Sequence, residues 1–260
     1  MIKTQGLSLG YHHNKIVQDV DLHIEKGKIT TIVGPNGCGK STVLKGISRL
    51  LNPIDGDVYL EDERIGDLTS KRIAKKIAIL PQIRRAPEDI RVRDLVALGR
   101  YPHLNWRGKL NEKDQETIEW ALDKTAMTDY ADRRIDQLSG GEAQRAWIAM
   151  ALAQKTELMI LDEPTTFLDL SHQLEVLELL SELNQNEGLS ILMVLHDLNQ
   201  AIRFSDQIYV MKEGRVICGG KPDQVLNESI LQETFSVNAD FYSDRRHQCQ
   251  HMIAYKSHQQ

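Results

Sequence analysis

One glycine-rich segment has the residue types and spacing needed to hold a phosphate chain. Residues 34–41 read Gly-Pro-Asn-Gly-Cys-Gly-Lys-Ser and directly follow the apolar run at 29–33. Glycines let such a loop curl so that its backbone N–H groups point toward an anion. Lys40 would then reach the β- and γ-phosphates of a nucleoside triphosphate, and the Ser41 hydroxyl would ligate Mg²⁺. The alternative is an ordinary glycine-rich turn before a helix.

A second segment, at residues 138–145, also has the features of an anion site. It reads Leu-Ser-Gly-Gly-Glu-Ala-Gln-Arg and precedes an alanine-rich stretch at 146–153 that favours a helix. A Ser-Gly-Gly start offers a hydroxyl group, exposed backbone N–H groups and the positive end of the helix dipole. Taken alone, the same pattern also fits a plain helix N-cap.

Three short apolar runs each lead to a polar residue. They end before Gln82, Asp162 and His196. Continuous rather than alternating apolar residues indicate strands buried on both faces, as in a parallel sheet covered by helices. Such sheets bind ligands at the carboxyl ends of their strands. Because the phosphate loop also follows a strand, we expect four useful positions to meet at one sheet edge.

Other parts of the chain have different patterns. Apolar residues alternate with polar ones around residues 20–24, and the runs 208–211 and 215–218 flank a plausible hairpin turn, which predicts antiparallel strands outside the central sheet. Residues 112–127 have helical spacing within a region poor in strand signals, which predicts a helical insertion.

Composition narrows the class of protein. The chain has 260 residues, 41% apolar and 27% charged, so it fits one large α/β domain or one domain with an inserted lobe. A net charge of -5 argues against strong nonspecific binding to nucleic acid. No apolar run approaches the roughly 20 residues of a membrane-spanning helix, and the three cysteines are too scattered for a disulfide scaffold. We expect a cytoplasmic protein with reduced thiols.

The motifs, taken together and in this order, resemble those of the ATP-binding subunits of ATP-binding cassette (ABC) transporters over nearly the whole chain. Residues 34–41 match the family's Walker A motif, 158–163 its Walker B motif and 138–145 its signature sequence. Single positions match as well: Tyr11 the adenine-stacking aromatic residue, Gln82 the Q-loop glutamine, Leu168-Asp169 the D-loop and His196 the switch histidine.

The resemblance implies a fold and a division of the chain. The fold is α/β, a P-loop NTPase (RecA-like) core sheet with an antiparallel β subdomain and an inserted α-helical subdomain. All of residues 1–260 would form one ABC ATPase domain. Within it, 1–83 and 156–260 would make the nucleotide-binding core with its antiparallel part, and 84–155 the helical subdomain that carries the signature.

The resemblance also implies roles for single residues. Glu163 would polarise the attacking water as general base, with Gln82 and His196 as the other catalytic residues. Mg²⁺ would be held by Ser41, Gln82 and Asp162. ATP would contact Tyr11, Gly34, Pro35, Asn36, Gly37, Cys38, Gly39, Lys40, Ser41, Thr42, Ser139, Gly140, Gly141 and Asp169.

Two details of these residues lead to further expectations. Asp162 and Glu163 are adjacent, and neighbouring strand residues point to opposite faces, which would separate their tasks. Cys38 lies inside the loop, so its alkylation should inhibit unless ATP protects it.

In this family the signature of one subunit completes the ATP site of another. This chain has one copy of each motif, so we expect a homodimer that closes on two ATP molecules and opens on hydrolysis. Its expected partners are two transmembrane permease subunits and, indirectly, an extracellular or periplasmic substrate-binding protein, with no nucleic acid. The subunit would then lie peripherally on the cytoplasmic face of the membrane.

Three segments indicate the subtype. Residues 96–103, 163–169 and 194–201 look like the branch that imports ferric siderophores, haem or vitamin B12, of which ferric siderophores are the commonest cargo. A haem or vitamin B12 import ATPase remains the alternative, and a soluble ABC ATPase without a transporter is a further one. A small-molecule kinase using the same phosphate loop would not need the signature, the D-loop or His196.

Two clusters remain open. The first holds five arginines near few acidic residues, and it fits either a permease-facing surface or a solvated basic face; its members are Arg84, Arg85, Arg91, Arg93 and Arg100. The second is His247-x-Cys249-x-His251, whose side chains would share one face of a strand. Because such ligands spread over roughly 13 Å, we do not expect a metal site there.

Overall fold

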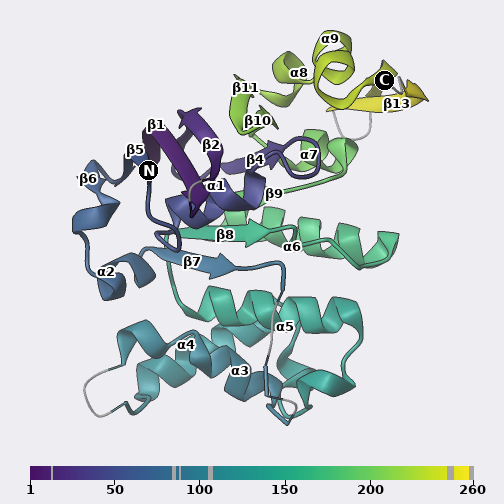
Figure 1. The fold of residues 1–260 in the computed structure, drawn as a ribbon. Helices are drawn as coiled ribbons and strands as arrows, with labels where there is room; N and C mark the ends of the chain where they lie inside the picture. Colours follow the sequence, from purple (N-terminus) through teal and green to yellow (C-terminus); the bar gives the residue numbers. More distant parts are fainter. Residues whose placement is uncertain (13, 84–85, 88, 105–107, 245–248, 258–260) are drawn as a thin grey trace. The chain divides into compact units, whose positions relative to one another are not determined.

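The structure, a computed structural model, describes residues 1–12, 14–83, 86–87, 89–104, 108–244 and 249–257 (Figure 1). The chain divides into two compact units. The first unit consists of Met1–Leu68 and Leu192–Gln260, and the second of Thr69–Ile191.

The first unit contains most of the strands. Its elements are β1 (Ile2–Tyr11), β2 (Asn14–Val20), β3 (His23–Ile24), β4 (Ile29–Val33), α1 (Lys40–Ile47), β5 (Asp55–Leu60), β6 (Glu63–Arg64), the end of β9 (Ser190–Val194), α7 (Leu198–Phe204), β10 (Gln207–Lys212), β11 (Arg215–Gly220), α8 (Pro222–Val225), α9 (Glu228–Ile230), β12 (Val237–Asp244) and β13 (Cys249–Ser257).

Strands from the N-terminal part of this unit form an antiparallel sheet. Its strands lie in the order β2-β1-β5-β6, and β3 also pairs with β1. The alternation around residues 20–24 therefore predicted antiparallel strands correctly. In the register, Leu7 lies opposite Val20 and Ile2 opposite Leu60, so buried apolar side chains pair across neighbouring strands.

The strand before the phosphate loop is fully buried. Every residue of β4 is buried, as expected for a strand covered on both faces. It pairs in parallel with β10, with Thr30 opposite Gln207 and Val33 opposite Val210. The sequence-based expectation that residues 208–211 lie outside the central sheet was wrong. The hairpin itself is correct, because β10 and β11 are antiparallel.

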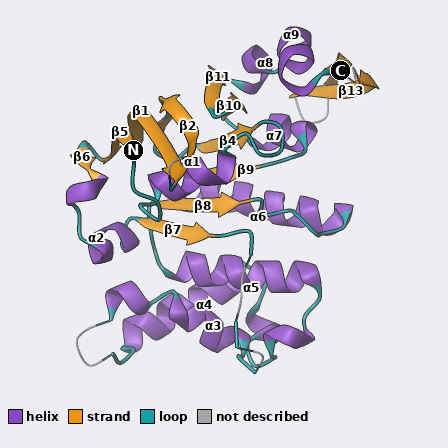
Figure 2. Ribbon diagram, viewed as in Figure 1, coloured by secondary structure: helices purple, strands orange, loops and turns teal. Residues whose placement is uncertain are grey.

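The second unit is mainly helical (Figure 2). Its elements are α2 (Ser70–Ala74), β7 (Ile77–Leu80), α3 (Val92–Leu98), α4 (Glu112–Lys124), α5 (Gly140–Ala153), β8 (Leu158–Asp162), α6 (Leu170–Glu187) and the start of β9. Strands β7 and β8 are parallel, with Ile77 opposite Leu158 and Leu80 opposite Leu161. The predicted buried parallel strands are thus found here.

Helices α3, α4 and α5 pack on one another around fully buried apolar side chains, which include Leu95, Ile118 and Leu122. The predicted helical insertion is therefore present. Its proposed limits, 84–155, differ from those of the compact unit, which also includes β7, β8 and α6. The division of the chain into 1–83 with 156–260 and 84–155 stays a prediction.

A buried ion pair ties these helices together. The Arg100 Nε donates to Asp114 Oδ1 at 2.9 Å, and Arg100 Nη1 donates to the Ala153 carbonyl at 2.8 Å. The two charged side chains are only 7% and 3% exposed. Burial opposes ionisation of Asp114, yet hydrogen bonds from the Asn111 backbone and Arg100 lower the pKa of that carboxyl below its ordinary value.

The other described arginines of the predicted basic cluster also have acidic partners. Arg91 lies 3.8 Å from Asp132, and Arg93 pairs with Glu119. Arg84 and Arg85 lie outside the described residues. The statement that this cluster has few acids near it was therefore wrong for Arg91, Arg93 and Arg100.

Candidate functional site

The phosphate loop follows β4 and leads into α1, as its sequence predicts. Gly34 has φ 156, and a Cβ atom there would lie 2.2 Å from the Met211 carbonyl oxygen and 2.8 Å from Cys38 Sγ. Gly39 is the N-cap of α1 with φ 106, a conformation that side chains with a Cβ rarely adopt. Glycine is thus required at both ends of the curl. Between them, Pro35 is half-buried, while Asn36 and Gly37 are exposed.

Lys40 lies at the first position of α1 and its side chain folds back over the loop. Its Nζ donates to the Gly34 carbonyl at 2.9 Å and to the Pro35 carbonyl at 3.0 Å. The residue is only 5% exposed, so a positive charge is held against the loop. Ser41, half-buried, and Thr42, buried, follow in the first turn of α1. The helix ends at Ile47, and Leu50 beyond it is 65% exposed.

The turn between β10 and β11 supports this loop, which the sequence analysis did not foresee. Glu213 and Gly214 both have positive φ, at 49° and 78°, as a two-residue hairpin turn requires. The Gly214 N–H donates to the Cys38 carbonyl at 3.0 Å, and the Gly214 carbonyl accepts from Gln18 N at 2.8 Å. The sequence predicted the hairpin, but it did not indicate that the hairpin turn contacts the phosphate loop.

Cys38 is buried, with 5% exposure, although its loop suggests an accessible thiol. Burial raises the pKa of this thiol, and the positive charge of Lys40 opposes the rise only in part. The thiolate that reacts with alkylating reagents is therefore scarce at neutral pH. Labelling of Cys38 in the folded protein should therefore be slow, and the expectation that its alkylation inhibits unless ATP protects it stays a prediction.

Two further predicted residues belong to the first unit. Tyr11, the last residue of β1, is 40% exposed, and its hydroxyl accepts from Lys45 Nζ at 3.2 Å. The same ammonium lies 5.6 Å from the Tyr11 ring centroid. His196 is exposed and directly precedes Asp197, whose side chain caps α7 by accepting from Gln200 N at 3.0 Å.

In the second unit, β8 ends at Asp162 and Glu163 lies outside the strand. Glu163 has φ 53, in the left-handed region that non-glycine residues enter at a cost. The expectation that strand alternation alone separates the two carboxylates was therefore wrong. The backbone turns at Glu163 instead, and strained residues of this kind cluster at functional sites.

Side chains from two separate segments hold the Glu163 carboxylate. Its Oε2 accepts from Gln82 Nε2, which comes from 81 residues away, and from Thr166 Oγ1 at 3.0 Å. Both Gln82 and Glu163 are half-buried. The structure thus brings together two of the three predicted catalytic residues. It adds Thr166, which the sequence analysis missed although a hydroxyl three residues after the acid is a usable signal.

Asp169 begins α6 as its N-cap and remains exposed. Its Oδ1 accepts from His172 N at 3.0 Å, from Ser171 Oγ at 2.9 Å and from His172 Nδ1 at 2.7 Å. The backbone hydrogen bond from His172, followed by those from the Ser171 and His172 side chains, lowers the pKa of this carboxyl. His172 is the second residue that the sequence analysis missed.

The start of α5 carries the signature residues. Ser139 accepts from Glu142 N at 3.3 Å, and the Glu142 side chain accepts from Ser139 N at 2.8 Å, which together form a capping box. The bond from the Ser139 backbone, then one from Tyr130, lowers the pKa of Glu142. Ser139 and Gly140 are exposed, whereas Gly141 is buried. The motif is thus a helix N-cap, and its role as an anion site stays a prediction.

The predicted site residues divide between the two units. The phosphate loop, Tyr11 and His196 belong to the first unit. Gln82, the carboxylates at 162–163, the signature residues and Asp169 belong to the second. The convergence of four strand ends and the magnesium ligand set therefore stay predictions.

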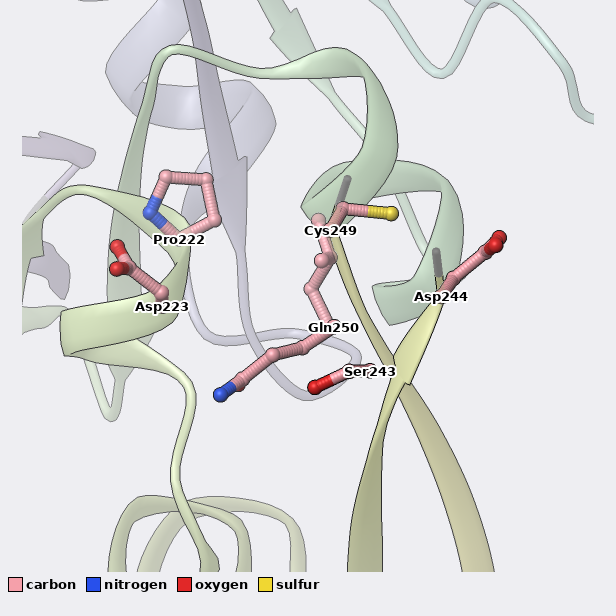
Figure 3. A pocket seen from close by; sticks show the side chains of 7 residues that line it. Pro222, Asp223, Ser243, Asp244, Cys249 and Gln250 are labelled. Atoms are coloured by element: carbon pink, nitrogen blue, oxygen red, sulfur yellow. The ribbon is translucent and has the colours of Figure 1, made fainter. Parts of the chain in front are cut away.

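A separate pocket lies at the C-terminal hairpin of the first unit (Figure 3). Its volume is about 580 Å³, and its lining includes Pro222, Asp223, Ser243, Asp244, Cys249 and Gln250. Burial, then the charge of Asp244, raises the pKa of the Cys249 thiol. Within the described ranges no group of three or more His, Cys, Asp and Glu side chains could hold a metal ion, and His247 lies outside them.

The chain is similar both to a protein-family model and to individual known proteins. Residues 17–166 match the family model described as ABC transporter. The iron(3+)-hydroxamate import ATP-binding protein FhuC of Bacillus subtilis (strain 168) is 51% identical over 245 residues, 94% of this chain and 91% of the relative. The petrobactin import ATP-binding protein FpuD of Bacillus anthracis is 46% identical over 243 residues, 94% of this chain and 89% of the relative.

Solved structures agree with these matches. A chain of an inward-facing ABC transporter described as metal-chelate type has a TM-score of 0.85 at 27% identity, covering 98% of this chain and 97% of its own length. A dimeric ATP-binding cassette in a post-hydrolysis state, bound to ADP and phosphate, has a TM-score of 0.74 at 30% identity, covering 85% of this chain and 99% of its own. With its motifs and these similarities, the chain belongs to the ABC transporter family, as an ATP-binding and ATP-hydrolysing subunit.

Proposed function

We propose that this ABC ATPase powers the import of ferric siderophores through a separate membrane permease. The observation that carries the proposal is 51% identity over 94% of the chain to an ATP-binding protein named for iron(3+)-hydroxamate import. The similarity extends far beyond the nucleotide motifs that unrelated cargo systems share. A second relative, named for petrobactin import, supports the same class of cargo.

For the chemical step, Glu163 is proposed as the general base. Its Oε2 accepts from Gln82 and Thr166, which fix the orientation of the carboxylate, and a base must be aimed at the water it activates. His196, at the end of an apolar strand, is proposed to donate to the γ-phosphate. Asp169 is proposed to act near the nucleotide through its ionised carboxylate, which hydrogen bonds to His172 and Ser171 favour.

For nucleotide binding, the phosphate loop supplies backbone N–H groups and the buried ammonium of Lys40. Tyr11 is proposed to stack on the adenine, and its 40% exposure leaves ring surface for that contact. Ser139, Gly140 and Gly141 are proposed to meet the nucleotide of a second subunit with the start of α5.

A magnesium ion fits the proposed donor set. Ser41, Gln82 and Asp162 offer hydroxyl, amide and carboxylate oxygens, which are the ligands that hard cations prefer. When bound, the ion would neutralise charge that develops on the transferred phosphate.

A homodimer is proposed as the active form. Phe167 is 92% exposed and has φ 67, a conformation that costs free energy in a bulky residue. Leu170, three residues along the chain, is also 69% exposed, and pairing with a second subunit would cover both side chains.

The dimer can be tested directly. In a Glu163→Gln background with ATP, Phe167→Ser should weaken the dimer at least about tenfold, measured by sedimentation or light scattering. Leu50→Ser is the matched control, because Leu50 is 65% exposed in the first unit. Equal dimer affinity in both variants would remove Phe167 from the interface.

The permease is proposed as two separate transmembrane subunits. No helix in the part of the chain that the structure describes is both long and apolar enough to cross a membrane. The ATPase would act from the cytoplasmic face, and an extracellular or periplasmic binding protein would deliver the cargo to the permease.

The cargo is tested by growth of a deletion strain under iron limitation. Single iron sources are supplied, namely hydroxamate and catecholate siderophores, citrate and haem, and vitamin B12 dependence is tested alongside. Loss of growth on a siderophore, restored by the wild-type chain but not by Glu163→Gln, supports the proposal. A defect confined to haem or vitamin B12 would reassign the cargo. Complete absence of a defect, in a strain lacking all other ATPases of this type, would contradict an import role.

A further inference from the structure

We propose that His172 is a positioning residue for ATP hydrolysis, holding Asp169 of the D-loop and Gly141 of the signature in one fixed arrangement. This inference rests on the proposed roles of Asp169 and Gly141 at the nucleotide. All the contacts that carry it lie within the second unit.

The first contact joins His172 to Asp169. The Asp169 carboxylate is favoured in its ionised form, so the 2.7 Å contact between Asp169 Oδ1 and His172 Nδ1 requires a proton on Nδ1. The backbone N–H of His172 donates to the same oxygen at 3.0 Å. His172 therefore donates two hydrogen bonds to the Asp169 carboxylate, one from its backbone and one from its ring. The second bond fixes the orientation of the ring.

The second contact joins the imidazole ring to Gly141. A Cβ atom on Gly141 would lie 2.2 Å from His172 Cδ2 and 2.7 Å from His172 Cγ. Gly141 has no positive φ, so the ring and not the backbone conformation demands glycine here. The imidazole thus lies directly against the backbone of the second helical residue of α5.

Two further contacts join α5 to the segment around the start of α6. A Cβ atom on Gly140 would lie 3.4 Å from Leu168 Cδ2, in ordinary contact. Arg145 Nη1 donates to Glu175 Oε2 at 2.6 Å, one turn farther along both helices. Leu168 lies just before α6, and His172 and Glu175 lie in its first turns, so the start of α6 and the residue before its N-cap contact the start of α5.

His172 connects two groups with separate tasks at the nucleotide. Asp169 is a charged residue at the start of α6, and Gly141 contributes to the N–H-rich start of α5. A flat ring with a donor nitrogen satisfies both contacts at once. An error of about 1 Å in such positions is enough to lower a rate strongly, so His172 should affect turnover more than nucleotide binding.

The two contacts can be separated by substitution. His172→Asn keeps a donor near the Nδ1 position and removes the ring, whereas His172→Phe keeps the ring and removes the donor. His172→Ala removes both. Gln185→Ala is the control, because Gln185 is exposed on the same helix. Each variant is assayed for kcat, for KM, and for ATP affinity at concentrations where the chain is monomeric.

We expect His172→Ala to lower kcat about tenfold or more, consistent with loss of a hydrogen bond to a charged group, with monomer ATP affinity unchanged within twofold. His172→Asn and His172→Phe should each recover part of kcat. If His172→Ala has the kcat of Gln185→Ala, or lowers only thermal stability, the positioning role is wrong. A wild-type chain without ATPase activity would instead overturn the proposed function.

A double substitution tests the ring contact without any activity assay. Gly141→Ala should lower the melting temperature of the wild-type chain, because its Cβ meets the ring. In the His172→Ala background the same change should cost much less, since the ring is gone. Equal losses in both backgrounds would show that the ring does not lie on Gly141.

Discussion

The phosphate loop of the first unit is held differently from the proposed catalytic edge of the second, which consists of Gln82, Glu163 and Thr166. In the loop, Lys40 bonds to carbonyls five and six residues back along the chain. At the catalytic edge, Glu163 accepts from Gln82, which lies 81 residues away. The loop is thus organised by hydrogen bonds to its own backbone carbonyls, donated by Lys40 and by the Gly214 N–H, while the edge is organised by side chains that meet only in the folded protein.

This difference indicates how each region should respond to substitution. A loop that arranges its own N–H groups contributes mainly to holding the phosphates. A carboxylate oriented by distant side chains contributes mainly to the chemical step. Substitutions in the loop should therefore change nucleotide affinity, and those at the edge should change the rate of hydrolysis.

The largest effect is expected for Glu163→Gln. Removing a general base should lower steady-state phosphate release about 10²- to 10⁴-fold, while ATP affinity stays within a few-fold of the wild type. Glutamine keeps the size of the side chain and an oxygen that can accept from Gln82. Phosphate release and binding of a fluorescent ATP analogue are measured on the same preparation.

Thr166, which also contacts the Glu163 carboxylate, provides a control for the Glu163→Gln result. Thr166→Val removes a hydrogen bond to Glu163 Oε2 and should lower the rate only several-fold, about the effect of losing one such bond. Should Glu163→Gln lose affinity as strongly as rate, the separation of tasks between loop and edge fails.

The next largest effect concerns the stability of the second unit. Asp114→Asn leaves Arg100 charged and buried, which should cost about 3–5 kcal/mol of unfolding free energy. The pKa of Asp114 is lower in the folded state than its ordinary value of 3.8, which applies to the unfolded chain. Its ionised carboxylate therefore contributes its full stabilisation of the fold above pH 3.8, and this stabilisation is lost as pH falls below that value. Urea unfolding of wild type and variant from pH 7 to 3 checks this.

The two unfolding free energies should run parallel from pH 7 to about pH 5 and converge below about pH 4. A constant difference down to pH 3 would mean that ionisation of Asp114 does not stabilise the fold. Asp136→Asn, which breaks an exposed pair with Arg134, is the control and should change stability by less than about 1 kcal/mol.

A smaller effect is expected for the loop lysine. Lys40→Ala removes two hydrogen bonds and the phosphate-directed charge, so affinity for ATP should fall about 10- to 100-fold. Lys28→Ala is the control in the same unit, because its ammonium pairs with Asp206 and has no proposed role at the nucleotide. Calorimetric titration that finds equal affinities for wild type and Lys40→Ala would contradict the role of the loop.

The smallest effect is expected for the loop thiol. Cys38 is buried and its pKa is raised, so a thiol reagent should label it slowly at pH 7 and faster as pH approaches 9. Mass spectrometry after limited labelling can compare this with the denatured chain. Rapid labelling of Cys38 at pH 7 in the folded protein would show that the loop opens more readily than its hydrogen bonds indicate.

Much of the fold could be predicted because its signals are local. The buried runs before Gln82, Asp162 and His196 form the strands β7, β8 and β9, and the Ser139 start of α5 is a helix cap. The pairing of β10 with β4 could not be read from the hairpin pattern, because alternation shows a strand but not its neighbour.

The sequence by itself determined the family, the phosphate loop and the identity of the acid at position 163, because spacing within a short segment encodes each of them. Only the tertiary structure decided that Glu163 leaves the strand in a left-handed conformation and accepts from Gln82 and Thr166. It also placed His172 against Gly141. Contacts between residues far apart in the chain depend on packing between whole elements, and no local pattern encodes that packing.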